Sequence, residues 1–159
     1  HRGLNVDLVD ARIERFNEGS ITLGEIFLNP TRIYCDPVVD LIQDGPCDSE
    51  FIHAICHITG GGLSNLLRLH DSLGWHISNP LPVLPEFDWI QSNGNVSDRE
   101  MYRTFNMGCG MIIAVDPSVA ESVLQWIEQR MDGCAIIGHV VDNGGKVTHT
   151  NPEVFFEHY

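Results

Sequence analysis

The chain has 159 residues, of which 9 are Lys or Arg and 22 are Asp or Glu, so its net charge at pH 7 is −13. Hydrophobic residues make up 43% of the chain, which is enough to build the core of one globular domain. The acidic balance excludes nucleic acid as an expected partner, because a phosphate backbone needs clustered Lys and Arg. No apolar run reaches the roughly 18 residues that cross a bilayer, and we recognise no signal peptide, so we expect no membrane partner.

Five cysteines are spread widely along the chain. The odd count and the wide spacing are unlike those of a secreted disulfide scaffold, so we expect reduced thiols in a cytoplasmic protein. His53, Cys56 and His57 lie close together in the sequence. No second pair of ligands follows them, and a structural zinc site usually needs four ligands, so we expect no metal site.

Hydrophobic periodicity and turn residues divide the chain into alternating helices and strands. We expect helices at residues 4–16, 21–29, 37–43, 63–69, 86–91, 98–103 and 116–130. We expect extended segments at residues 31–34, 51–58, 73–77, 111–115, 135–141 and 146–149. The strand at 51–58 is expected in the centre of a sheet, and the last two strands are expected to form a hairpin around Asn143, Gly144 and Gly145. The alternation predicts an α+β or α/β domain, in which helices pack against a mixed sheet of about four to six strands.

The strongest local signal is the sequence His-Ile-Thr-Gly-Gly-Gly-Leu at residues 57–63, between a predicted strand and a predicted helix. Glycines let backbone N–H groups approach an anion closely, and a helix N-terminus adds positive dipole. Thr59 offers a hydroxyl group, and His57 offers a proton donor. The glycine spacing fits neither the dinucleotide fingerprint nor the P-loop. The segment is therefore either an anion site or a tight turn without a ligand.

A second polar group, formed by Arg103, Thr104 and Asn106, precedes a Gly-Cys-Gly sequence and a predicted strand. Arg recognises phosphate in a bidentate manner. The alternative is a helix end at which Arg103 pairs with a carboxylate. Cys109 is either a nucleophile or a small buried residue, and the apolar strand after it favours burial. A third group, Thr31 and Arg32, is explained more simply by a structural arginine.

Five motifs together resemble a known family, the aminoimidazole ribonucleotide synthetases, also called phosphoribosylformylglycinamidine cyclo-ligases. The motifs are residues 30–34 (Pro-Thr-Arg-Ile-Tyr), 57–63, 94–96 (Gly-Asn-Val), 100–110 and 137–138 (Ile-Gly). Their order and spacing are similar to those of the C-terminal half of the family. The resemblance covers about residues 1–150 and leaves residues 151–159 as a tail. Residues 65–69 look more like archaeal than bacterial members.

This resemblance implies the C-terminal domain of a two-domain enzyme of de novo purine biosynthesis. In that reaction, ATP activates the formyl-amide oxygen of formylglycinamidine ribonucleotide as a phosphate ester, and a ring nitrogen then attacks. The products are aminoimidazole ribonucleotide, ADP and phosphate, and magnesium assists. The resemblance also implies that an N-terminal domain, absent from this chain, binds most of the ATP and Mg²⁺ and forms a homodimer. The chain alone is expected to be inactive.

The resemblance assigns catalytic roles to His57 and Thr59. It assigns substrate or phosphate binding to a larger set: Thr31, Arg32, Gly60, Gly61, Gly62, Arg103, Thr104 and Asn106. The sequence departs from the family at Ser64 and Leu67, where many members carry Glu and Pro, and after His1, where Arg2 and Gly3 replace a Ser-Asn-Gly stretch. Two alternatives remain: a non-catalytic binding domain of the same fold, or a related ATP-using enzyme of the selenophosphate synthetase, thiamine-monophosphate kinase or hydrogenase-maturation type.

Overall fold

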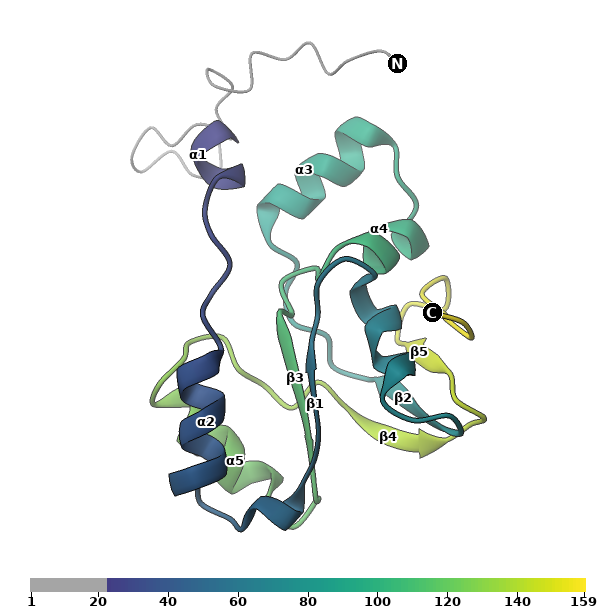
Figure 1. The fold of residues 1–159 in the computed structure, drawn as a ribbon. Helices are drawn as coiled ribbons and strands as arrows, with labels where there is room; N and C mark the ends of the chain where they lie inside the picture. Colours follow the sequence, from purple (N-terminus) through teal and green to yellow (C-terminus); the bar gives the residue numbers. More distant parts are fainter. Residues whose placement is uncertain (1–22) are drawn as a thin grey trace.

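The computed structural model describes residues 23–159, so the helix expected at residues 4–16 lies outside the described part. Five strands in this part form two separate sheets (Figure 1). β1 (Ile52–His57) pairs with β3 (Met111–Val115) in an antiparallel sheet of two strands. The α+β class is therefore confirmed. The expected central position of the first strand is wrong, because β3 is its single strand partner among the described residues.

The second sheet has three strands in the order β4-β2-β5. β2 (Leu73–Ile77) lies between β4 (Gly138–Asp142), which is antiparallel to it, and β5 (Val147–His149), which is parallel to it. The hairpin expected between β4 and β5 is therefore wrong, because β2 separates the two strands (Figure 1). The turn that joins them passes over Gly74, where any Cβ would overlap with Asn143. A glycine at this position thus permits the close crossing.

Five α-helices and two 3₁₀ helices occupy the rest of the described chain. They are α1 (Leu23–Phe27), α2 (Cys35–Asp44), η2 (Ser49–Phe51), η3 (Gly62–Arg68), α3 (Pro85–Gly94), α4 (Asp98–Thr104) and α5 (Ala120–Glu128). The segment expected at residues 31–34 forms no strand and runs as coil between α1 and α2. No helix in residues 23–159 has both the length and the apolar character that crossing a membrane requires.

Local hydrogen bonds explain where two of these helices begin. Ser97 caps α4, because its side chain accepts a hydrogen bond from the backbone N–H of Glu100, and a Ser followed three residues later by Glu is the sequence pattern of a capping box. The helix expected from residue 116 begins only at Ala120, because Asp116 forms a turn first. Its carboxylate accepts a hydrogen bond from the N–H of Ser118 at 2.8 Å.

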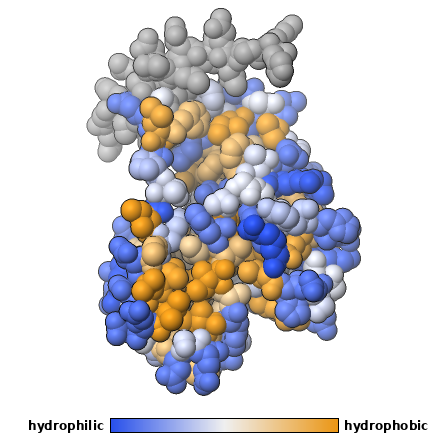
Figure 2. Space-filling view, in the orientation of Figure 1, coloured by the Kyte–Doolittle hydropathy of each residue, from blue (hydrophilic) through white to orange (hydrophobic). Residues whose placement is uncertain are grey.

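The helices cover different parts of the two sheets. α2 and α5 lie together beside the β1–β3 sheet, whereas α3 and α4 lie near its other end (Figure 1). Figure 2 shows apolar side chains gathered over the surface where α2 and α5 lie, and Val39 and Ile42 of α2 are among the exposed apolar residues. The outer side of this helix pair is therefore partly apolar.

The core joins both sheets and includes the end of the chain. Its buried members are Cys56, Ile58, Leu63, Leu66, Trp75, Ile77, Val147, Val154 and Phe156. Phe156 is only 1% exposed and exchanges two backbone hydrogen bonds with Val147, at 2.9 and 3.0 Å. Residues 151–159 therefore pack against the same core as β1, η3 and β2.

Candidate anion-binding site

The glycine loop, residues 59–62, follows β1 at the point where the two-stranded sheet ends. Ile58 donates its N–H to the carbonyl of Gly110 at 2.9 Å, which extends the pairing of β1 with the segment before β3. The backbone then enters the left-handed region, with φ values of +100° at Gly61 and +50° at Gly62. Glycine adopts these values without the steric penalty that a side chain brings. The expected helix after the loop is a 3₁₀ helix, η3.

The N–H groups of the loop are not equally available to a ligand. Gly62 donates its N–H to the carbonyl of Thr59 at 2.9 Å, which closes the turn. Within residues 23–159, the N–H groups of Gly60 and Gly61 have no hydrogen-bond partner. No atom lies within 4 Å of the position that a Cβ of Gly60 would occupy. Gly60 and Gly61 therefore present free donors, whereas Gly62 has a structural role.

A pocket of about 280 Å³ opens beside this loop. Its polar lining residues come from three separate segments and are Thr31, His57, Thr59, Gly60, Thr104 and Asn106. The structure thus brings together six of the ten predicted site residues. None of the residues that line the pocket is acidic, although the chain carries a net charge of −13. Gly61, Gly62, Arg32 and Arg103 do not line it.

Asn106 belongs to a tight turn that holds it at the edge of the pocket. Its side-chain carbonyl accepts the N–H of Gly108 at 3.0 Å, and its backbone carbonyl accepts the N–H of Cys109 at 2.9 Å. Met107 and Gly108 both have positive φ, at +50° and +91°. The hydrogen bond to the side-chain oxygen fixes the orientation of the amide, and the NH₂ group of Asn106, which has no partner among residues 23–159, is the donor that can reach a ligand.

Two arginines from the sequence prediction stand outside the pocket. Arg32 donates from Nη1 to the backbone carbonyl of Asp132 at 2.6 Å, so it joins the segment before α2 to the segment after α5. Arg103 is exposed in the last turn of α4, and its side chain makes no hydrogen bond or ion pair with residues 23–159. Its neighbour Thr104 donates its hydroxyl to Glu100 at 3.2 Å. The carboxylate partner considered for Arg103 is therefore not found among these residues.

Sequence reasoning missed Tyr34, which contacts His57. The two rings meet edge to face, with centroids 5.6 Å apart. Tyr34 occupies the space beside Gly110 that a side chain there would fill, and burial raises the pKa of its hydroxyl. Tyr34 ends the motif at residues 30–34, but its contact with His57, across 23 residues of chain, becomes visible only in the fold.

Sequence reasoning also missed the roles of Ser64 and Asn65, whose side chains donate hydrogen bonds to backbone carbonyls of the glycine loop. Ser64 donates its hydroxyl to the carbonyl of Gly61 at 2.7 Å, and Asn65 donates its amide to the carbonyl of Gly62 at 2.7 Å. Both side chains are buried. The structure thus gives Ser64 a local function at the loop. Two hydrogen-bonding residues that follow a glycine triplet after a single leucine are the signal that indicates such support.

The structure places few groups for metal or thiol chemistry near the pocket. Within residues 23–159, no group of three or more His, Cys, Asp or Glu side chains is arranged to hold a metal ion. All five cysteines are free thiols. Burial raises the pKa of the Cys109 thiol to about 11, so this residue is overwhelmingly protonated at neutral pH. The interpretation of Cys109 as a small buried residue is therefore favoured over a nucleophile.

We expect iodoacetamide to label Cys35 at least about tenfold faster than Cys109 at pH 8, because the thiolate is the reactive species. Cys35 is exposed, whereas Cys109 is partly buried and has its pKa raised to about 11. Peptide mass spectrometry at timed intervals measures both rates, and the urea-unfolded protein is the control in which the difference disappears. Equal labelling rates in the folded protein would contradict the burial of Cys109.

Together, the fold and this pocket define an α+β domain with a glycine loop at the end of a strand. One chain in the crystal structure of the HypE-HypF complex shares this fold, with a TM-score of 0.56 and 18% sequence identity. The match covers 82% of this chain and 46% of that chain. The chain belongs to the family described as AIR synthase related protein, C-terminal domain, which matches residues 5–150.

Curated relatives of this chain are phosphoribosylformylglycinamidine cyclo-ligases. The protein of that name from Methanopyrus kandleri is 41% identical over 128 residues, which are 80% of this chain and 35% of the relative. The one from Nitrosococcus oceani is 44% identical over 123 residues, which are 76% of this chain and 33% of the relative. The one from Methanocaldococcus jannaschii is 41% identical over 130 residues, which are 79% of this chain and 36% of the relative. The chain thus spans about a third of the length of these relatives.

Proposed function

We propose that this chain is the C-terminal part of an ATP-dependent cyclo-ligase, which converts formylglycinamidine ribonucleotide to aminoimidazole ribonucleotide in purine biosynthesis. The relatives that carry this activity in their names support the reaction class. The free N–H groups of Gly60 and Gly61, beside a pocket without carboxylates, are the observation that carries the proposal. Both ATP and the ribonucleotide substrate bear phosphate, which such donors recognise.

The pocket residues divide naturally into two proposed roles. Gly60 and Asn106 in the pocket, together with Gly61 beside it, would donate hydrogen bonds to a phosphate group, and Thr31 and Thr104 would complete the wall. His57 and Thr59 would lie beside the reacting oxygen, where fixed donors stabilise developing negative charge. Arg103 is exposed and without a partner in residues 23–159, so its guanidinium is available to a ligand that approaches α4. Arg32 is engaged with Asp132 and fits a structural role better.

ATP and magnesium fit this part of the chain to different degrees. ATP would supply the phosphoryl group, and the loop donors are suited to an anionic group of this kind. The pocket offers no carboxylate, and Mg²⁺ is held mainly by carboxylate and phosphate oxygens, so its protein ligands would come from elsewhere. We therefore propose that a separate N-terminal domain provides most of the ATP and Mg²⁺ site, and that this part of the chain alone does not turn over. We also propose that the N-terminal domain forms a homodimer contact and that the enzyme is cytoplasmic.

Gly60→Val in the full-length protein should lower kcat/KM by at least about tenfold, because the new side chain covers the N–H donors of the loop. Gly60 has no positive φ and open space around it, so this variant keeps the fold. By contrast, valine at Gly61 would be strained, because φ is +100° there. Turnover is measured with formylglycinamidine ribonucleotide and ATP, and circular dichroism verifies the fold.

Gly60→Ala is the matched control, and its smaller side chain should cause a smaller loss. Wild-type kcat/KM in a folded Gly60→Val protein would instead support the tight turn without a ligand. Phosphate binding without turnover by the full-length wild-type protein would favour the non-catalytic binding domain.

A further inference from the structure

We propose that the tail, residues 151–159, holds the glycine loop in the geometry that presents its N–H donors, acting through Tyr159, Arg68 and Asn65. The tail lies beyond residues 5–150, the part that the family matches. Asn65, Arg68 and Tyr159 are thus positioning residues rather than catalytic ones. The effect on ligand binding rests on the anion site proposed above, whereas the effect on loop geometry does not.

Asn65 orients the peptide units of the loop by donating hydrogen bonds to the carbonyl groups of the loop. Its amide NH₂ donates to the carbonyls of Gly62 at 2.7 Å and Gly60 at 3.3 Å, and approaches that of Thr59 at 3.5 Å. In a trans peptide unit, the carbonyl of one residue and the N–H of the next point in opposite directions. Holding the carbonyls of Thr59 and Gly60 toward Asn65 therefore directs the N–H groups of Gly60 and Gly61 away from it.

Arg68 fixes which way the Asn65 amide faces. It donates from Nη2 to the side-chain oxygen of Asn65 at 2.5 Å and from Nε to the backbone carbonyl of Asn65 at 3.4 Å. Because Arg has no acceptor, the amide oxygen must face Arg68 and the amide NH₂ must face the loop. A rotation of the amide by 180° would lose both sets of hydrogen bonds. Asn65 is 1% exposed, so water does not replace them.

The ring of Tyr159 in turn stacks on the guanidinium of Arg68 and lies beside Gly61 of the loop. The guanidinium carbon of Arg68 lies 4.8 Å from the centre of the Tyr159 ring, within the range of a cation–π contact. The Tyr159 ring edge also lies 3.3 Å from the position that a Cβ of Gly61 would occupy. Tyr159 is 63% exposed, so its ring contributes little to the core. Its contacts are thus directed at Arg68 and Gly61.

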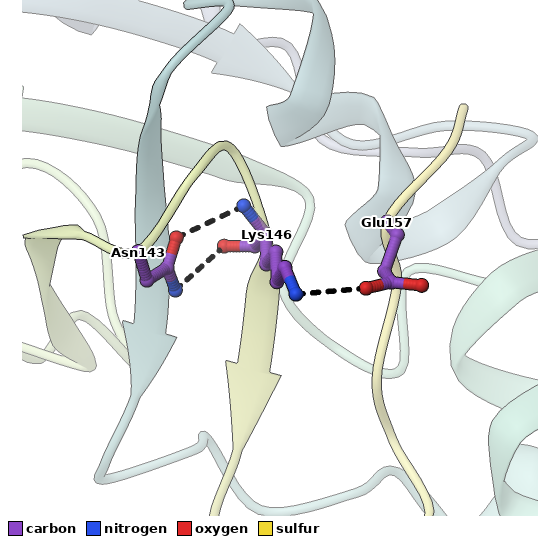
Figure 3. A network of polar contacts seen from close by, with 3 residues as sticks. All are labelled: Asn143, Lys146 and Glu157. Carbon is purple, nitrogen blue, oxygen red and sulfur yellow. Dashed lines mark hydrogen bonds and ion pairs between the residues drawn. The ribbon is translucent and has the colours of Figure 1, made fainter.

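The tail is anchored just before Tyr159. Lys146 forms an ion pair with Glu157 at 2.8 Å, which lowers the pKa of the glutamate carboxyl. The side chain of Asn143 binds the backbone of Lys146 on both sides. Its oxygen accepts a hydrogen bond from the N–H of Lys146 at 3.0 Å, and its NH₂ donates to the carbonyl of Lys146 at 3.3 Å (Figure 3). Together with the Val147–Phe156 bridge, this network positions the last residues of the tail over Arg68.

Hydrogen exchange of the ligand-free, full-length protein tests the geometry. Gly62 and Ser64 donate their N–H groups within the loop, so peptides covering residues 59–69 report on its order. Tyr159→Ala should raise exchange there about two- to fivefold, the effect of losing one exposed cation–π contact. Asn65→Ala should raise it further, and Tyr159→Phe, which keeps the ring, should restore wild-type exchange. Because Tyr159 is exposed, we expect its variants to keep the wild-type melting temperature, and the melting temperature of each variant is measured as a control for global unfolding.

Binding of inorganic phosphate, measured by calorimetry, separates this proposal from the proposed function. Weaker phosphate binding by Tyr159→Ala, rescued in Tyr159→Phe, supports the tail as a positioning element for the anion site. Faster loop exchange in Tyr159→Ala, with phosphate bound by neither wild type nor variant, supports the positioning of the loop by the tail and overturns the anion site. Unchanged loop exchange in Tyr159→Ala overturns the positioning role of the tail, whatever the results for Asn65→Ala and for phosphate binding.

Discussion

Replacing Gly62 by alanine should destabilise the protein by about 2–5 kcal/mol, since it combines a forced overlap with a left-handed backbone. A Cβ at Gly62 would overlap with the backbone carbonyl of Tyr102 and lie 2.7 Å from that of Phe105. Tyr102 lies in the last turn of α4, and Phe105 is the C-cap residue, which donates its N–H to the carbonyl of Met101, so neither carbonyl moves without disturbing the end of the helix. Urea unfolding, followed by circular dichroism, measures the change in the free energy of unfolding.

Gly60→Ala is the matched control for this measurement, two residues earlier in the same loop. Its Cβ would meet no atom within 4 Å, and its φ is not positive. A surface change of this kind is expected to alter the free energy of unfolding by about 0.5 kcal/mol or less. Equal losses in Gly60→Ala and Gly62→Ala would contradict the close approach of the loop to α4.

Phe156→Ala should lower the free energy of unfolding by about 3–5 kcal/mol, the usual cost of removing a fully buried aromatic ring. Phe156 is 1% exposed and packs in the core cluster, although it lies only three residues from the end of the chain. The variant removes buried apolar surface and leaves a cavity beside Val147. Thermal unfolding by calorimetry measures the loss.

Phe155→Ala is the matched control, because Phe155 is only partly buried and precedes Phe156 directly. It should cost clearly less than Phe156→Ala. If both variants unfold at the wild-type temperature, the tail does not belong to the core.

Elements with strong local signals could be predicted from the sequence. The capping pattern at Ser97 located α4, and apolar runs bounded by turn residues located β1, β2 and β3. The order of the strands could not be predicted in this way. Asn143, Gly144 and Gly145 favour a hairpin locally, but β2 pairs with both neighbouring strands across long stretches of chain. Such pairing depends on tertiary contacts that no short window contains.

The candidate site was predicted in its main segments and missed in its supports. Glycines, hydroxyls and amides near strand ends pointed to the residues that now line one pocket. Asn65 was missed because its function lies in facing the carbonyls of the loop, and only the fold fixes that direction. The resemblance grouped Arg32 with the site, whereas the residues alone favoured a structural arginine, and the hydrogen bond to the carbonyl of Asp132 fits that structural role.

The position of β2 between β4 and β5 has a consequence for biosynthesis. His76 in β2 meets Thr148 in β5, which lies 72 residues later in the chain. As the ribosome extends the chain, β2 is synthesised long before β4 and β5. Both edges of β2 therefore remain unpaired during that interval. Unpaired strand edges are sites of aggregation. A chain that stops before residue 138 has neither partner for β2, so premature termination there should yield an aggregating product rather than a smaller folded domain.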